Sequence, residues 1–225
     1  MLSIAQQIYY KWDICHKKSM SDDSRFTGVL SESKVDLNPH QVEAALFAFK
    51  SPLSKGAILA DEVGLGKTIE AGILLSEFWA EHKRHMLIIV PASLRSQWSM
   101  ELLEKFYLPS LILERSSYDA LAGKTENPFL TDDNIIICSY QFVVAHADEL
   151  SKVMWNIVII DEAHKLRNVY KKGNVMASAL KETLRPFKKV LLTATPLQNN
   201  LKELYGLISF IDDGFFSSAQ TFEDQ

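Results

Sequence analysis

Short apolar runs alternate along the chain with segments in which apolar residues recur every three or four positions. A continuous apolar run of four or five residues predicts a strand buried on both faces, and the periodic segments predict helices that cover those faces. The predicted strands are 57–60, 86–90, 111–113, 135–138, 156–160 and 189–193. Their alternation with helices predicts a doubly wound α/β domain with a mostly parallel sheet.

Helical stripes are clearest in three of the intervening segments. In 42–49, 94–102 and 201–211, the apolar residues fall on one face of the expected helix. Trp98 lies on the stripe of the second segment, which favours a place in the core over stacking on a nucleic-acid base.

The two ends of the chain differ from the middle. An amphipathic pattern followed by polar residues predicts a helical extension at 1–36. Turn residues dominate the tail at 213–225. We therefore expect one α/β domain at 37–212 with an extension before it and a tail behind it.

Composition agrees with a globular domain. The chain has 225 residues, of which 47% are hydrophobic, and this is enough to bury a substantial core. A formal net charge of −4 argues against strong nonspecific DNA binding by the surface as a whole. Any nucleic-acid contact is therefore expected to be confined to a limited part of the surface. No apolar run approaches the length of a membrane span, so we expect no membrane partner and a cytoplasmic location. Cys15 and Cys138 lack metal-ligand spacing and are expected to be reduced.

The most informative segment is 61–68, which reads Asp-Glu-Val-Gly-Leu-Gly-Lys-Thr directly after the predicted strand 57–60. A strand that leads through a glycine-rich turn into a helix directs backbone N–H groups and the positive helix end toward one point, which suits a polyphosphate. Lys67 is expected to reach the β- and γ-phosphates of a nucleoside triphosphate, and Thr68 to bind Mg²⁺. The predicted nucleotide-binding residues of this loop are Glu62, Val63, Gly64, Leu65, Gly66, Lys67 and Thr68.

The loop departs from the full P-loop signature, because Asp61 stands where the first glycine belongs. A plain turn with a surface lysine is the alternative. A second motif further along the chain weakens that alternative.

Strand 156–160 ends in two adjacent acids, Asp161 and Glu162. Open α/β sheets bind ligands at the carboxyl ends of their strands, so we expect Asp161 to face Mg²⁺ and Glu162 to orient or deprotonate an attacking water. Together with Lys67 they are the predicted catalytic residues, and Thr68 and Asp161 are the predicted Mg²⁺ ligands. The alternative is that both acids only cap the helix that follows.

Five segments in a fixed order resemble the motifs of helicase superfamily two. They are 38–41, 61–68, 87–98, 161–168 and 192–200, and the fourth begins with Asp-Glu-Ala-His, a DEAH box. More narrowly, they are similar to the first motor lobe of Swi/Snf-type ATPases, and the match covers about 37–212. The resemblance implies a RecA-like P-loop fold, ATP and Mg²⁺ as cofactors, and double-stranded DNA as partner.

The Asp-Glu-Val form of the loop, followed by Ile69-Glu70-Ala71-Gly72, resembles a bacterial branch of this family. That branch includes the ATPase that recycles RNA polymerase. The resemblance therefore adds RNA polymerase or another protein as a candidate partner, and it implies a bacterial, nucleoid-associated protein.

The resemblance also implies that Gln41 recognises adenine, which would make ATP the substrate. The residues themselves allow another role: Asn38 can be an N-cap with Pro39 at the first helical position, so that Gln41 completes a capping box. Both interpretations stay open at this point.

Coupling between nucleotide state and lobe movement is implied for His164, Thr193 and Thr195. Each has a structural alternative. Thr195 can cap a helix that begins at Pro196, and His164 can be a polar residue satisfied beneath the sheet.

Contacts to the DNA backbone are implied for Pro91, Ser93 and Ser139, which follow the predicted strands 86–90 and 135–138. Hydroxyl and backbone N–H groups at these positions would bind the sugar-phosphate backbone without reading the base sequence.

Motors of this family use a second lobe, which supplies arginine fingers and the rest of the DNA track. We therefore expect a second lobe of the same longer chain to complete the site, and residues 1–225 alone to hydrolyse ATP very slowly. Three functions remain: the ATPase lobe of a double-stranded DNA translocase or remodeller, an ATP-dependent switch for a protein partner, and a scaffold without hydrolysis. The intact acids and Lys67 argue against the scaffold.

Overall fold

The computed structural model describes residues 38–51, 55–61, 66–170, 173–198 and 201–216. Its centre is a six-stranded sheet in the order β1-β6-β5-β2-β4-β3, in which every recorded pair of neighbouring strands is parallel. The strands are β1 (Gly56–Leu59), β2 (Met86–Val90), β3 (Ser110–Ile112), β4 (Ile135–Ser139), β5 (Ile157–Ile160) and β6 (Lys189–Leu192). All six predicted strands are confirmed to within one residue at each end.

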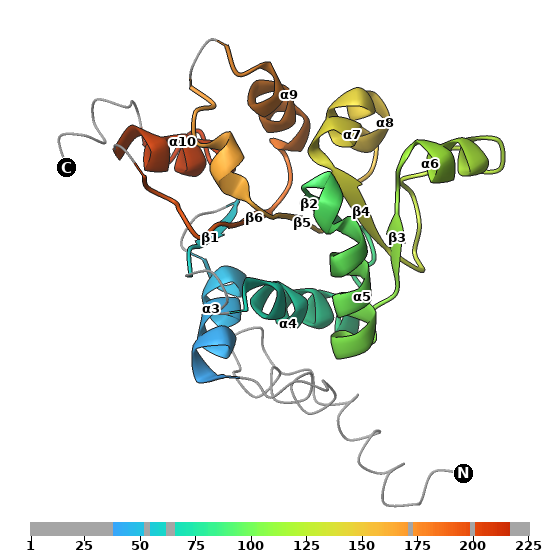
Figure 1. Ribbon diagram of the computed structural model, residues 1–225, viewed down its shortest axis with the longest axis horizontal. Helices are drawn as coiled ribbons and strands as arrows, with labels where there is room; N and C mark the ends of the chain where they lie inside the picture. Colours follow the sequence, from blue (N-terminus) through green and yellow to red (C-terminus); the bar gives the residue numbers. More distant parts are fainter. Residues whose placement is uncertain (1–37, 52–54, 62–65, 171–172, 199–200, 217–225) are drawn as a thin grey trace, which may run out of the picture.

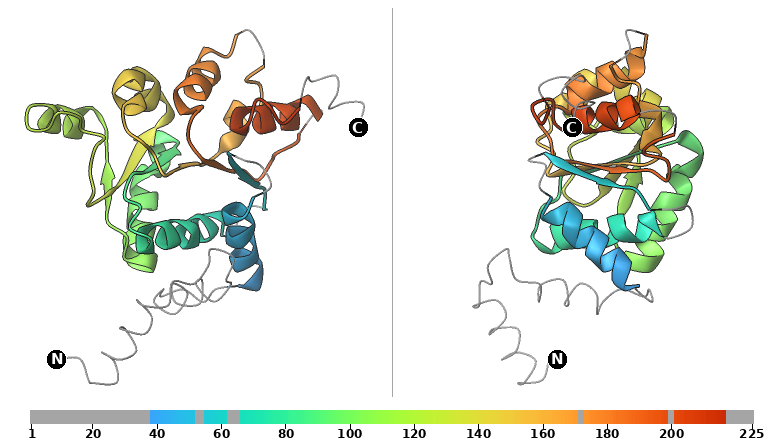
Figure 2. Two further views of the ribbon diagram at one scale, coloured as in Figure 1. Left: turned by 180° about the vertical axis from the view of Figure 1, so that it is seen from behind. Right: turned by 90° about the vertical axis from the view of Figure 1, so that its left-hand side faces the viewer.

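Helices cover both faces of this sheet (Figures 1 and 2). One layer consists of α3 (Pro39–Phe49), α4 (Lys67–Ala80) and α5 (Arg95–Phe106), which share a core with one face of the sheet. The other layer consists of α6 (Arg115–Ala122), α7 (Tyr140–Ala145), α8 (Ala147–Ser151), α9 (Val175–Leu184) and α10 (Leu201–Ile211). The doubly wound α/β fold is therefore confirmed.

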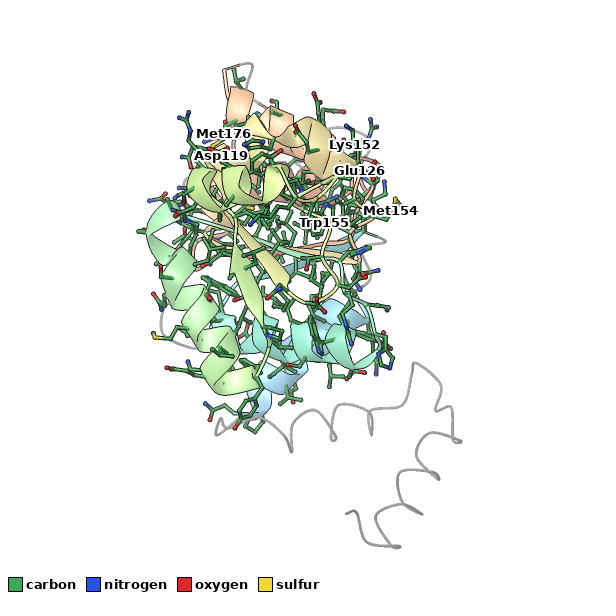
Figure 3. All side chains as sticks on the ribbon, turned by 90° about the vertical axis from the view of Figure 1, so that its right-hand side faces the viewer. Asp119, Glu126, Lys152, Met154, Trp155 and Met176 are labelled. Carbon is green, nitrogen blue, oxygen red and sulfur yellow. The ribbon has the colours of Figure 1, made fainter. Side chains whose placement is uncertain are left out.

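Side chains alternate between two cores because successive residues of a strand point to opposite faces. Ile88 and Ile159 belong to the core under α4 and α5, whereas Leu87 and Val158 belong to the core under α7 and α9. Side chains fill the space on both sides of the sheet (Figure 3). This burial explains why β2, β4 and β5 read as unbroken apolar runs.

Two short 3-10 helices, η1 (Ala92–Leu94) and η2 (Ala163–Leu166), follow β2 and β5. They matter for function because they come directly after strands whose ends carry candidate residues. Among the described residues, no helix combines the length and apolar composition that a membrane crossing needs. The extension at 1–36 and most of the tail, 217–225, lie outside the described residues.

Candidate nucleotide-binding site

The candidate residues come together at one edge of the sheet. In a parallel sheet all carboxyl ends lie at the same edge, so segments far apart in sequence become neighbours there. The residues that follow the six strands at this edge are Ala60, Pro91, Leu113, Tyr140, Asp161 and Thr193.

Lys67 is the first residue of α4 and lies at this edge. Its Nζ donates a hydrogen bond to the backbone oxygen of Asp61, at 2.7 Å. β1 and β5 lie on either side of β6, so Lys67 and Asp161 follow strands that end close together. Burial raises the pKa of Asp161, and the positive charge of Lys67 acts against that rise. The structure thus brings together the two motifs from which a phosphate site was predicted. The loop residues Glu62, Val63, Gly64 and Leu65 lie outside the described residues.

The Gln41 side chain of α3 lies close to Gly66, the last residue before α4. Gly66 has a φ of 92°, and a Cβ atom added there would lie 2.4 Å from Nε2 of Gln41. The buried Gln41 side chain also accepts a hydrogen bond at Oε1 from the backbone N–H of Asn38, at 3.2 Å. Gln41 therefore makes the predicted capping contact and lies against the loop as well, where an adenine-binding role remains a prediction.

Asp161 is held in place by several hydrogen bonds. Its Oδ2 accepts from the indole Nε1 of Trp98 at 2.9 Å, and its Oδ1 accepts from the backbone N–H of Glu162 at 2.8 Å. Burial raises the pKa of Asp161, whereas the hydrogen bonds from Trp98 and Glu162 and the charge of Lys67 lower it. The Tyr140 hydroxyl donates a hydrogen bond to the backbone oxygen of Asp161.

The predicted metal ligands, Thr68 and Asp161, are chemically suited to Mg²⁺. A hydroxyl and a carboxylate are both hard oxygen donors, and each carboxylate oxygen of Asp161 can accept more than its one recorded hydrogen bond. Thr68 belongs to the first turn of α4 and is partly exposed. The donor set therefore fits the ion.

Glu162 adopts an unusual backbone conformation. With φ 54° and ψ 43° it lies in the left-handed region, which costs a residue other than glycine about 1–3 kcal/mol and often marks a functional position. Its Oε2 lies 3.0 Å from Nδ1 of His164, and its side chain is 41% exposed. Glu162 occupies the N-cap position of η2, but its side chain makes no capping hydrogen bond there.

In the described part of the chain, no hydrogen bond joins His164 to Thr193. His164 pairs with Glu162 instead, and its 30% exposed side chain is not buried beneath the sheet. The Thr193 hydroxyl accepts from the backbone N–H of Thr195 at 3.2 Å. The alternative in which Thr195 caps a helix that begins at Pro196 does not hold, because 196–198 are not helical and α10 begins at Leu201. Roles for these residues in coupling remain predictions.

The three residues predicted to contact DNA have different surroundings. Ser93 is exposed in η1, and Pro91 before it is partly exposed. Ser139 is buried, and its Oγ accepts from the backbone N–H of Phe142 at 3.2 Å, so it caps α7. Of the two serines predicted to contact DNA, Ser93 in η1 has an accessible hydroxyl and Ser139 does not.

Sequence reasoning missed two residues of this site. Trp98 is buried in the core as predicted, yet its indole N–H also holds Asp161; the available signal was that a buried tryptophan N–H usually needs a partner. Glu70 is fully buried on α4, one turn after Lys67. Burial and the nearby Asp61 raise the pKa of Glu70 to about 8, although Lys67 lowers it. An acid inside an otherwise apolar helical stretch was the signal for Glu70.

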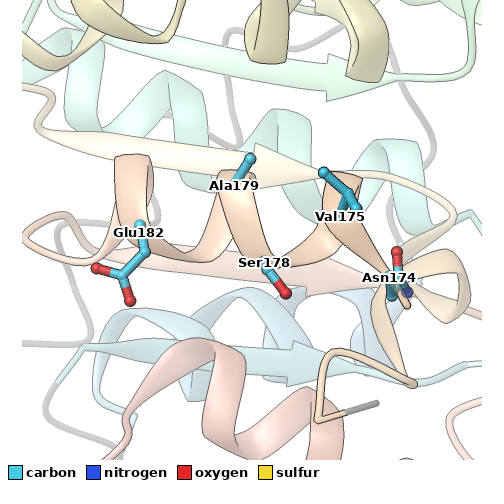
Figure 4. Close-up of a pocket in the computed structure, with 5 residues that line it drawn as sticks. All are labelled: Asn174, Val175, Ser178, Ala179 and Glu182. Atoms are coloured by element: carbon cyan, nitrogen blue, oxygen red, sulfur yellow. The ribbon is translucent and has the colours of Figure 1, made fainter. Parts of the chain in front are cut away.

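A surface hollow on α9 lies apart from these residues (Figure 4). It is lined by Asn174, Val175, Ser178, Ala179 and Glu182. None of the candidate site residues takes part in it.

The parallel six-stranded sheet with helices on both faces, and its likeness to a solved SWI2/SNF2 ATPase core, define a RecA-like domain of the α/β class. The chain belongs to the SNF2-related domain family, whose model matches residues 14–225. It corresponds to the first lobe of the SWI2/SNF2 ATPase core. Relatives in this family include chromatin-remodelling proteins and ATP-dependent helicases.

Two bacterial relatives and one solved structure illustrate the match. The ATP-dependent helicase YqhH of Bacillus subtilis is 38% identical over 83% of this chain and 31% of its own length. The RNA polymerase-associated protein RapA of Erwinia tasmaniensis is 33% identical over 93% of this chain and 22% of its own. The Sulfolobus solfataricus SWI2/SNF2 ATPase core, solved in complex with double-stranded DNA, matches with a TM-score of 0.69 and 27% identity over 85% of this chain and 39% of that chain. The chain thus spans less than half the length of each.

Proposed function

We propose that the chain is the ATP-binding lobe of a Swi/Snf-type, double-stranded DNA-dependent ATPase that hydrolyses ATP to ADP and phosphate. The observation that carries this proposal is the placement of Lys67, at the start of α4, and Asp161, after β5, at one edge of the sheet, where β1 and β5 lie on either side of β6. Beside them, Glu162 presents a partly exposed carboxylate. The likeness to an ATPase core solved with double-stranded DNA supports DNA as the partner.

Each residue has a proposed role in hydrolysis. Lys67 binds the β- and γ-phosphate oxygens, and Gln41 binds adenine. Glu162 accepts a proton from the water whose oxygen attacks the γ-phosphorus, while the bond from that phosphorus to the bridging oxygen breaks and ADP leaves. Mg²⁺, when held by Thr68 and Asp161, supplies positive charge that stabilises the phosphate oxygens.

The remaining predicted residues complete the proposal. The backbone of Glu62, Val63, Gly64, Leu65 and Gly66 would bind phosphate oxygens. Pro91, Ser93 and Ser139 would contact the DNA backbone, and His164, Thr193 and Thr195 would couple the nucleotide state to movement.

The proposed domain organisation assigns the motor lobe to 37–212, an extension to 1–36, and to 213–225 a tail toward a second lobe. Because that second lobe would supply arginine fingers, which can be worth about 10³-fold in rate, residues 1–225 alone should turn over ATP very slowly.

A second candidate function is an ATP-dependent switch that binds a protein partner without moving along DNA. The similarity to the RNA polymerase-associated protein RapA over 93% of this chain favours it. RNA polymerase is then the partner to test. For either function, the proposed location of this protein is the bacterial cytoplasm, in association with the nucleoid.

Equilibrium binding of ATP to residues 1–225 tests the nucleotide site. Lys67→Ala should abolish measurable binding, because it removes the ammonium that faces the phosphates. Lys124→Ala is the control, because that lysine is exposed beyond α6. Equal ATP affinity in wild type and Lys67→Ala would contradict the proposed site.

A further inference from the structure

Two buried aromatic side chains hold Asp161 from two different segments of the chain. Trp98, on α5, donates its indole N–H to the carboxylate oxygen Oδ2 at 2.9 Å. Tyr140, at the start of α7, donates its hydroxyl to the backbone oxygen of the same aspartate. Each aromatic side chain is only 2% exposed. The aspartate is therefore fixed both in its backbone and in its side chain.

We propose that Trp98 is a positioning residue for the metal, which sets the orientation of the Asp161 carboxylate, and that Tyr140 supports it by fixing the backbone at this point. The proposal rests on the proposed ATPase function, because it assigns Asp161 to Mg²⁺. Neither aromatic residue would touch the ion or the nucleotide.

The covalent geometry of an aspartate side chain does not fix the orientation of its carboxylate. Rotation about its last side-chain bond is broad, so an unconstrained carboxylate samples many orientations. In this structure the backbone N–H of Glu162 holds Oδ1 and the indole of Trp98 holds Oδ2, and together they define one carboxylate plane. Hydrogen bonds of this kind orient metal ligands, and their loss typically lowers metal affinity about 10- to 100-fold.

Trp98 is well placed to act as a fixed donor. Its ring belongs to the core beneath α4 and α5, together with Leu102 and Phe106 from its own helix. Packing on this scale holds a side chain in one rotamer. The indole N–H therefore has a fixed direction toward Asp161.

The test is ATP binding to residues 1–225, measured both with Mg²⁺ titrated in at fixed ATP and in EDTA. Trp98→Phe removes the donor but keeps an aromatic ring in the core. Trp155→Phe is the matched control: Trp155, labelled in Figure 3, is also buried and donates its indole N–H to a backbone oxygen, that of Leu150 at 3.0 Å. Both variants lose one tryptophan and one hydrogen bond, so thermal unfolding of both corrects for general destabilisation.

The expected result is that Trp98→Phe raises the Mg²⁺ concentration needed for half-maximal ATP binding about 10- to 100-fold and leaves the affinity in EDTA unchanged. Tyr140→Phe should shift the Mg²⁺ requirement in the same direction, and Trp155→Phe should not shift it. A Mg²⁺ requirement in Trp98→Phe equal to that of wild type overturns this inference alone. A wild-type chain that binds no ATP overturns the proposed function and this inference with it.

Discussion

Nδ1 of His164 lies 3.0 Å from Oε2 of Glu162, so the proposed general base is held by a residue of the same turn. Glu162 has a left-handed backbone conformation and lies directly before η2, so it forms the turn that leads from β5 into η2. The carboxylate is thus partly exposed and yet restrained. A base that is already fixed in position loses little conformational entropy when it accepts a proton from the attacking water. Removing His164 should therefore weaken proton transfer by Glu162.

His164→Ala should lower kcat about tenfold or more and leave the KM for ATP nearly unchanged, because positioned proton transfer contributes about 10²- to 10⁴-fold and only part of it depends on the histidine. Steady-state kinetics of the two-lobed protein measure this. His85→Ala is the control, since His85 precedes β2 and lies at the opposite edge of the sheet. A changed KM with constant kcat would show that His164 acts in binding instead.

Gly206→Ala should lower the free energy of unfolding by about 1–3 kcal/mol or more, as overpacking of a core does. A Cβ atom at Gly206 would lie 1.9 Å from the backbone oxygen of Arg167, so α10 could not approach η2 as it does. Denaturant unfolding measures the change. Gly123→Ala is the matched control, because an added Cβ there meets nothing within 4 Å. Equal stability of the two variants would contradict this packing.

The stability of the folded domain should depend on Lys189 at alkaline pH. This lysine is fully buried at the start of β6, and its Nζ donates to the backbone oxygens of Leu184, the last residue of α9, and of Phe187 in the turn that follows. Burial, with a smaller effect from Lys55, lowers the pKa of Lys189 from 10.5 to about 8. The folded chain therefore binds fewer protons than the unfolded chain between pH 8 and 10.5, and in this range the lysine makes stability rise with pH.

Denaturant unfolding of wild type and Lys189→Met at several pH values between about 7.5 and 10 tests this sign. The wild type should gain up to about 1.4 kcal/mol per pH unit relative to the variant, the value for one proton. Other titrating groups are common to both proteins and cancel. Parallel stability curves would show that the amine titrates normally in the folded state.

The fold could be predicted well because its signals are local. Each central strand is buried on both faces, so β2 and β5 read as unbroken apolar runs, and their ends were located to within a residue. The order of the strands could not be read in this way. It depends on which strands pair across long stretches of chain, as when β2 pairs with both β4 and β5.

The site was predictable where chemistry follows a strand directly. Lys67 and Asp161 were placed at the same edge because parallel strands end together. The bond from Trp98 to Asp161 was not predicted, since periodicity reveals that a residue is buried but not what its N–H meets. The alternative of a helix beginning at Pro196 could not be decided from the sequence, because proline permits a helix start without requiring one, and α10 begins at Leu201.

ATP hydrolysis by the chain joined to its proposed second lobe is the most direct test of a DNA-dependent ATPase. Rates are compared without nucleic acid, with double-stranded DNA and with RNA polymerase, beside a Glu162→Gln control. We predict that duplex DNA strongly raises the rate of ATP hydrolysis by the wild type, and that the rate with duplex DNA is about 10²-fold or more lower in Glu162→Gln. A rate that duplex DNA leaves unchanged, with ATP still bound, would contradict the claim, and stimulation by RNA polymerase alone would favour the protein-partner switch.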